Sequence, residues 1–304
     1  WNPWIVDTAL QVRQGQMKAN ADRAEKVRFV EHLSDGSLII AGSSHGKTLL
    51  DTSYQNIGMG ASRNDFFILR RAVNGSVTWY KRVYSSFTGA SVTRFFVQNE
   101  KIYVLLALGQ GVNRAGYNYL KLDTTVLFSS LPTQTTYRVL LVIQPNGISK
   151  MIPLDDNLPS GRVADIDIYP NGDIAAVTGQ ASTGMQLGSL QYPNNIGFFF
   201  LRLDSTGSIK QALKVYRASA LPGSALPLQM NSVRINRSDT TLFVGGLYAM
   251  NIGQPDHQYL IHNGASVVDT ITTKNYFPTS NAQIRYALFL KTDLLTSNWE
   301  SVLG

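Results

Sequence analysis

Residues that could carry out chemistry are few in this chain of 304 residues. There is no cysteine, so thiol catalysis, disulfides and thiolate metal sites are excluded together. His257 and His262 share one segment with Asp256, but their spacing lacks the helical context of a zinc motif. We therefore predict no metal site. The four histidines are His32, His45, His257 and His262.

Acidic residues offer the other route to chemistry, because a pair of carboxylates can cleave a glycosidic bond. Asp165 and Asp167 alternate along one predicted strand, so their side chains share a face. They could bind a cation or line a channel, and the simpler alternative is the solvated side of an edge strand. With no convincing catalytic set, we predict no catalytic residues, no cofactor and a non-enzymatic protein. The other acids considered are Asp155, Asp156 and Asp173.

The elements that would position these residues are β-hairpins. In segment 65–84, apolar runs flank Asn74-Gly75, and an Asn-Gly pair accepts the positive φ of a tight turn. Two hairpin types alternate along the chain, and their turn residues fall at matching offsets. The first type covers 26–44, 91–109, 162–180 and 230–248, with turns at Asp35, Glu100, Asn171 and Asp239; the second covers 65–84, 137–156, 197–216 and 286–304, with Gly75, Gly147, Gly207 and Thr296.

Two hairpins make four antiparallel strands, and four such units in series are typical of β-propeller blades. We predict an all-β, single-domain propeller over 1–304, with four blades of four antiparallel strands and a ring closed by the terminal strands. A β-sandwich or a solenoid is the alternative. Residues 1–12 would form a strand that closes the ring or pairs with a partner. The expected repeat units are 26–84, 91–156, 162–216 and 230–304.

The second hairpin with its preceding loop, Asn-Asp-Phe-Phe-Ile-Leu-Arg followed by Asn-Gly-Ser-Val-Thr-Trp, resembles the repeat of secreted bacterial β-propellers, the SBBP-type repeat. Only the first copy is close. Asp65 is replaced by Tyr137, Gly197 and Tyr286, and Trp79 by Met151, Gln211 and Glu300. The resemblance implies a propeller and secretion more than any activity.

Long segments between the hairpins, 45–64, 110–136, 181–196 and 249–285, are read as loops on one face of the disc and as interaction surfaces. Their aromatic side chains could stack on sugars or meet a protein partner, or fold back to hold their own loops. Candidate loop residues are Tyr54, Tyr117, Tyr119, Tyr192, Asp256, His257, Tyr259, Tyr276 and Phe277, and candidate terminal contacts are Trp1, Trp4 and Trp299.

The net charge of +7 comes from scattered Lys and Arg, with the densest groups at Arg70-Arg71 and Lys81-Arg82. No basic run of the kind that binds nucleic acid occurs, so we predict no nucleic-acid partner. No apolar run is long enough to span a membrane. We expect a secreted or cell-surface bacterial protein that acts in adhesion or assembly, with itself, another extracellular protein or a polysaccharide as partner. The alternative is a propeller that binds or cleaves carbohydrate.

Overall fold

The computed structural model describes most of the chain. The described residues are 4–6, 12–14, 26–44, 47–50, 53–56, 65–85, 90–109, 120–122, 125–128, 136–155, 158, 162–179, 186–187, 189–218, 229–251, 257–273, 283–293 and 298–301. All of the regular structure in these residues is β-strand. The predicted all-β class is therefore confirmed. The chain divides into two compact units, Trp1–Met151 and Ile152–Gly304, which we describe separately, and one domain over 1–304 stays a prediction.

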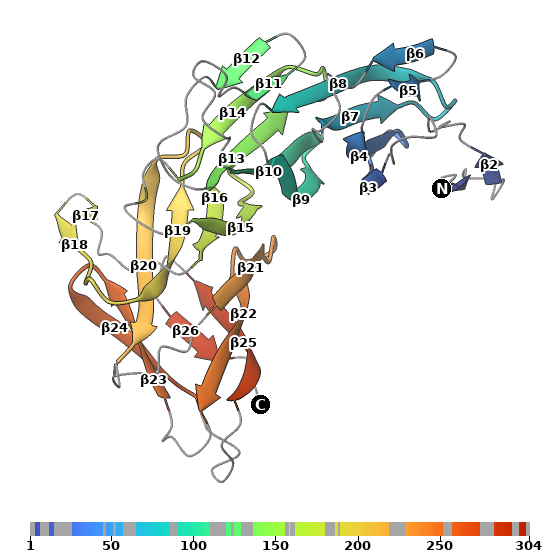
Figure 1. The fold of residues 1–304 in the computed structure, drawn as a ribbon. Coiled ribbons are helices and arrows are strands. Elements are labelled where there is room, and N and C mark those ends of the chain that lie inside the picture. Colours follow the sequence, from blue (N-terminus) through green and yellow to red (C-terminus); the bar gives the residue numbers. More distant parts are fainter. Residues whose placement is uncertain are drawn as a thin grey trace. The chain divides into compact units, whose positions relative to one another are not determined.

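The first unit contains a six-stranded sheet, a four-stranded sheet and two small two-stranded sheets (Figure 1). The six-stranded sheet has the order β12-β11-β8-β7-β4-β3, the four-stranded sheet has the order β14-β13-β10-β9, and the small sheets pair β1 with β2 and β5 with β6. The strands are β1 (Trp4–Val6), β2 (Val12–Gln14), β3 (Lys26–His32), β4 (Leu38–Ser44), β5 (Lys47–Leu50), β6 (Ser53–Asn56), β7 (Asp65–Arg71), β8 (Val77–Ser85), β9 (Ala90–Gln98), β10 (Lys101–Gly109), β11 (Leu120–Leu122), β12 (Thr125–Phe128), β13 (Thr136–Ile143) and β14 (Ser149–Pro153).

The second unit contains a six-stranded sheet of order β15-β16-β19-β20-β23-β24, a four-stranded sheet of order β21-β22-β25-β26, and the short pair β17-β18 (Figure 1). The strands are β15 (Val163–Ile168), β16 (Ile174–Thr178), β17 (Gln186–Leu187), β18 (Leu190–Gln191), β19 (Gly197–Leu203), β20 (Ile209–Arg217), β21 (Gln229–Ile235), β22 (Leu242–Asn251), β23 (His257–Asn263), β24 (Ser266–Thr273), β25 (Gln283–Asp293) and β26 (Asn298–Ser301).

The predicted pairs of hairpins are present as four consecutive groups of four neighbouring strands, which we call strand sets 1 to 4. They are β3-β4-β7-β8, β9-β10-β13-β14, β15-β16-β19-β20 and β21-β22-β25-β26. Set 4 is completed by β26, which pairs with β25, while β1 pairs with β2. Closure of a ring by the terminal strands thus stays a prediction.

Two segments predicted as loops instead supply strands. Within 110–136, β11 pairs with β8 at the outer edge of set 1, and within 249–285, β23 pairs with β20 at the outer edge of set 3. A strand edge presents unpaired N–H and C=O groups, and an added strand satisfies them. The connection between two hairpins of one set therefore extends the preceding set. The segments 45–64 and 181–196 also contain strand pairs, β5-β6 and β17-β18.

In each unit, a core forms where the two large sheets face each other. In the first unit it joins set 1 to set 2, for example Ile39, Ile68 and Phe66 with Val104 and Val139. In the second it joins set 3 to set 4, through Phe198, Phe200, Val215, Val233 and Val244. Each such side chain stabilises the fold by about 1.5–3 kcal/mol when fully buried.

The central strands are buried on both faces. Val104 and its neighbour Leu105 point to opposite faces of β10, and both are inaccessible to solvent, as are Phe198 and Phe199 on β19. Continuous apolar runs of this kind are typical of strands covered on both sides. The apolar runs 139–143 and 198–201 are buried throughout.

Five hairpins share one turn. In 33–37, Gly36 N–H donates to Leu33 C=O at 3.0 Å, Leu33 N–H donates to Ser37 C=O at 2.9 Å, and Gly36 has φ of 78°. This is a type I turn followed by a glycine bulge, which requires positive φ at its last position. The same bonds recur in 72–76, 144–148, 169–173 and 204–208, where the glycines are Gly75, Gly147, Gly172 and Gly207.

A β-bulge recurs in the first strand of every set. The register shifts between Val27 and Phe29, between Val92 and Arg94, between Val163 and Asp165, and between Met230 and Ser232. A bulge increases local twist and re-aims side chains. The four first hairpins therefore share a backbone irregularity that no residue pattern in the sequence displays.

Candidate functional site

The paired acids Asp165 and Asp167 lie on β15 and are almost fully buried. Asp165 Oδ2 accepts hydrogen bonds from Val233 N–H at 3.0 Å and from Arg234 Nη1 at 2.7 Å. Asp167 Oδ2 accepts from Ile235 N–H at 2.9 Å. Both carboxylates thus satisfy backbone donors on the free edge of β21. They join set 3 to set 4, and neither lies on a solvated face as the simpler alternative had it.

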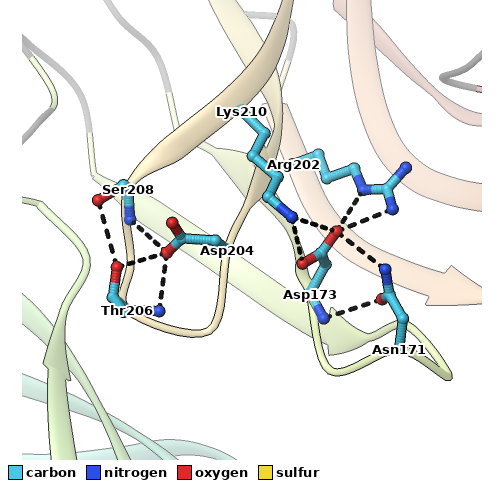
Figure 2. A network of polar contacts seen from close by, with 7 residues as sticks. All are labelled: Asn171, Asp173, Arg202, Asp204, Thr206, Ser208 and Lys210. Carbon is cyan, nitrogen blue, oxygen red and sulfur yellow. Dashed lines mark hydrogen bonds and ion pairs between the residues drawn. The ribbon is translucent and has the colours of Figure 1, made fainter.

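Asp173 is the centre of a second polar network, which follows the turn between β15 and β16 (Figure 2). Its carboxylate accepts from Arg202 Nε at 2.8 Å and from Lys210 Nζ at 2.9 Å, and Asn171 Nδ2 donates to it at 3.1 Å. Burial alone would raise the pKa of Asp173, but the bonds from Lys210, Asn171 and Arg202 outweigh it and hold the pKa below 3.8. The lone pairs are therefore occupied by the protein's own donors.

Figure 2 also shows the neighbouring turn, in which Asp204 Oδ1 accepts from the N–H groups of Thr206 at 2.7 Å and Ser208 at 3.1 Å. The hydrogen bond from the Thr206 hydroxyl, together with those from the two N–H groups, holds the pKa of Asp204 below 3.8. An aspartate that accepts the N–H groups of its own turn is a common structural device.

The basic pair Arg70-Arg71 of segment 65–84 makes hydrogen bonds within the protein. Arg70 Nη2 lies 2.6 Å from Asp35 Oδ2, and Arg70 Nη1 donates to Pro145 C=O at 3.2 Å. Trp79 Nε1 donates to the same carbonyl at 3.2 Å. Arg71 Nε donates to Gly75 C=O at 2.6 Å. Trp79 and Arg70 therefore connect set 1 to the turn of set 2, whereas Arg71 bonds within its own hairpin turn.

The most unusual chemistry among the described residues surrounds Lys214 on β20. Its side chain is fully buried, and Nζ donates to Pro193 C=O at 2.7 Å and lies 5.0 Å from the centre of the Phe199 ring. Burial lowers the pKa of Lys214 from 10.5 to about 8. An amine in this range can act as a base or a nucleophile. Here, however, it is closed off from solvent and already bonded, so it is suited to a structural role.

Lys214 stands directly opposite His262 of β23 in the pairing of the two strands. His262 is buried, and its Nε2 lies 2.9 Å from the Tyr216 hydroxyl. Burial lowers the pKa of His262 below 6.5. Hydrogen bonds with the backbone of Gly264 and Ala265 raise this pKa in part, and the positive charge of Lys214 lowers it. We call Lys214, Tyr216, His262 and Tyr192 the β20–β23 cluster.

Tyr192 closes this cluster from the segment after β18. Its hydroxyl donates to Ala212 C=O at 2.6 Å, and its ring makes an edge contact with Phe199 at 5.7 Å between centroids. Next to it, Leu190 packs against Gly264, where an added Cβ would lie 2.9 Å from Leu190 Cδ2. The segment therefore lies over the β23–β24 turn. The cluster holds the added hairpin against set 3.

Of the predicted loop residues, Tyr192 and Tyr259 have described side chains, and both are buried. For these two, the alternative that loop aromatics hold their own loops describes the structure. Tyr54, His257, Trp4 and Trp299 lie in strands β6, β23, β1 and β26, and their side chains are outside the described part. Tyr117, Tyr119, Asp256, Tyr276, Phe277, Trp1 and Thr296 lie outside the described residues altogether.

The sequence also contains a serine flanked by two glycines, in 42–46. Gly42-Ser43-Ser44-His45-Gly46 fits the pattern of a nucleophile elbow, which requires a sharp turn from a strand into a helix. Ser43 and Ser44 are instead paired within β4, opposite Phe66 and Asp65, and the next described element is the strand β5. The required strand-to-helix context is not met in this part of the chain.

The outer edge of the second unit's large sheet is β24, the last strand in its order. Seven of its eight residues are uncharged, the exception being Asp269, and six are Val, Ile or Thr. Val267 and Val268 are 51% and 39% exposed. Sequence reasoning passed over this strand, although its β-branched composition was a visible signal.

Comparisons with known proteins give no relative from which a function could be transferred: no family model matches the chain, and a search of curated proteins finds no significant match. The described residues contain no group of three or more acidic or histidine side chains placed to hold a metal ion. No helix in the described part is long and apolar enough to cross a membrane.

Proposed function

We propose that this chain is a secreted, non-enzymatic β-propeller of the SBBP type that acts in surface interaction, adhesion or assembly. The support is the succession of four strand sets, two in each unit, and the face-to-face packing of the two sets within each unit. In addition, the acids and bases that could have been catalytic are occupied by structural bonds, as at Asp165, Asp173 and Lys214.

The observation that carries an assembly function is the edge strand β24. Natural sheets protect their edges with lysines, prolines, bulges or a covering segment, because a free edge pairs with other chains. β24 has β-branched residues, two exposed valines, one acidic side chain and a register shift at Val268, but no lysine and no proline. The register shift at Val268 and the hydrogen bond from Thr270 N–H to Asp269 Oδ1, at 2.6 Å, interrupt the edge around 268–270 and leave 271–273 uninterrupted. Such a strand is suited to strand addition by a partner.

The proposed partner is a second copy of the chain, since β20 already accepts β23 by the same kind of antiparallel pairing. The scattered charge of +7 adds a weak attraction to acidic surfaces. Another extracellular protein is an alternative outcome of the test. A polysaccharide partner would use aromatic residues outside the described part, and a glycan array with a reducing-sugar assay tests for it.

The experiment is size-exclusion chromatography with light scattering over a range of concentrations, with electron microscopy of the same samples. We expect concentration-dependent oligomers in the wild type. The double variant Val267→Lys, Val268→Lys places charges on the edge and should shift the chain to monomer. Val73→Lys is the control, because Val73 is 66% exposed but lies in a hairpin turn. A wild-type chain that stays monomeric at high concentration would refute the assembly proposal.

A further inference from the structure

Two hairpin turns carry the pattern Asn-x-Ser with a residue other than proline in the middle, which marks a possible acceptor of N-linked sugar. The first is Asn74-Gly75-Ser76, between β7 and β8, and the second is Asn236-Arg237-Ser238, between β21 and β22. The pattern alone is short and common. What distinguishes these two copies is the geometry that the fold gives them.

In both turns, the serine hydroxyl is bonded to the asparagine side chain. Ser76 Oγ donates to Asn74 Oδ1 at 2.8 Å, and Ser76 N–H donates to the same oxygen at 3.0 Å. Ser238 Oγ donates to Asn236 Oδ1 at 2.9 Å, and its N–H does so at 3.2 Å. The carboxamide oxygen is thus occupied twice, which leaves the amide nitrogen Nδ2 as the side chain's remaining group.

Both turns lie at the surface of the protein. Asn74 and Ser76 are exposed, as are Arg237 and Ser238, while Asn236 is half-buried. In neither case does Nδ2 donate a hydrogen bond within the described part of the chain. A sugar at Nδ2 would therefore break no hydrogen bond that the described residues make.

The chain also contains closely matched turns without the pattern. Asn146-Gly147-Ile148 and Asn171-Gly172-Asp173 adopt the same turn as Asn74-Gly75-Ser76, with asparagine at the same position. Neither has a hydroxyl two residues after asparagine. Asn171 Nδ2 is in addition bonded to Asp173 at 3.1 Å. These two turns separate the effect of the motif from the effect of turn shape and exposure.

We propose that Asn74 and Asn236 are sites of N-linked glycosylation, a modification that rests on the extracellular part of the proposed function. The donor is an oligosaccharide linked to a lipid diphosphate. The Nδ2 atom forms a bond to C1 of the first sugar, the bond from C1 to the diphosphate oxygen breaks, the lipid diphosphate leaves, and Nδ2 loses one proton to a base of the transferring enzyme.

The experiment is to secrete the full chain through a eukaryotic secretory pathway and to map its peptides by mass spectrometry before and after enzymatic removal of N-glycans, which converts a modified asparagine to aspartate. We expect glycans at Asn74 and Asn236 and none at Asn146 or Asn171. Ser76→Ala and Ser238→Ala should each abolish the glycan at its own site, and Ser76→Thr should retain it.

The gain-of-site variant Ile148→Ser gives the sharpest control. Ile148 is 67% exposed, so the substitution removes no core contact, and it converts the third residue of a matched turn to serine. We expect a new glycan at Asn146. Unmodified Asn74 and Asn236 in the secreted, folded chain would overturn the proposal, whether or not Asn146 becomes modified. Light scattering on the deglycosylated chain measures the oligomeric state without the sugars. The glycosylation proposal and the assembly proposal can therefore be refuted independently of each other.

Discussion

Lys214 gives the most specific prediction about stability. We expect Lys214→Met to stabilise the second unit at neutral pH, because the variant keeps the long apolar stem and removes a buried ammonium group. The hydrogen bond to Pro193 is lost, but Pro193 is only half-buried, so water can replace it. A methionine sulfur also makes favourable contacts with an aromatic ring such as Phe199.

The size of the effect follows from the lowered pKa. A change in pKa from 10.5 in the unfolded chain to about 8 in the folded protein corresponds to at most about 3.4 kcal/mol, at 1.36 kcal/mol per pKa unit. Between these pH values the unfolded chain binds more protons than the folded protein, so stability rises with pH. The penalty is complete below pH 8 and disappears above 10.5. The wild type should therefore gain about 2–3 kcal/mol over this window.

The assay is pulse proteolysis in urea at several pH values between about 8 and 10, read by mass spectrometry of peptides from the second unit. This range ends before buried Tyr192, whose pKa is raised above 10.0 by burial, adds an opposing slope. Lys150→Met is the control, since Lys150 is exposed on β14. The reasoning is refuted if Lys214→Met and the wild type show the same dependence of stability on pH.

Two further predictions concern contacts between strands of the second unit, the pairing of β20 with β23 and the bond from β21 to Asp167. The pKa of His262 is lowered below 6.5, so below that pH the unfolded chain binds more protons than the folded protein, and acidification should destabilise the β23–β24 hairpin. His262→Phe should lose this acid sensitivity. The measurement is the rate of proteolysis within 257–273 at several pH values. Asp167→Ala leaves the Ile235 N–H without its carboxylate and should cost about 1–3 kcal/mol, whereas Asp167→Asn keeps an acceptor oxygen and should cost less. Hydrogen exchange of the β21 amides should be faster in Asp167→Ala than in Asp167→Asn. Equal exchange rates in the two variants would contradict this prediction.

Turns were the most predictable part of the fold, because their determinants are local. Gly75, Gly147 and Gly207 all have positive φ, as the Asn-Gly and Thr-Gly signals indicated. The same signal was overlooked at Asn263-Gly264, where Gly264 has φ of 63° and connects β23 to β24. That hairpin was predictable from its own residues, and its docking onto β20 was not.

Contacts between sets could not be predicted, since they depend on which distant edges meet. Asp165 and Val233 are far apart in sequence, and the alternation around Asp165 is equally compatible with a solvated strand. Lys214 presents the same difficulty. A lysine in an apolar strand signals an unusual position, but only the structure shows Pro193 and Phe199 beside it.

The added hairpins also impose an order on synthesis. When β8 leaves the ribosome its outer edge has no partner, and β9 and β10 are made before β11 arrives to cover it. In the same way, the edge of β20 waits while β21 and β22 are made, until β23 emerges. A strand edge left open during translation can pair wrongly with the next strand or with a neighbouring nascent chain. We infer that a holding chaperone that covers these two edges until β11 and β23 are made would raise the yield of correctly folded protein.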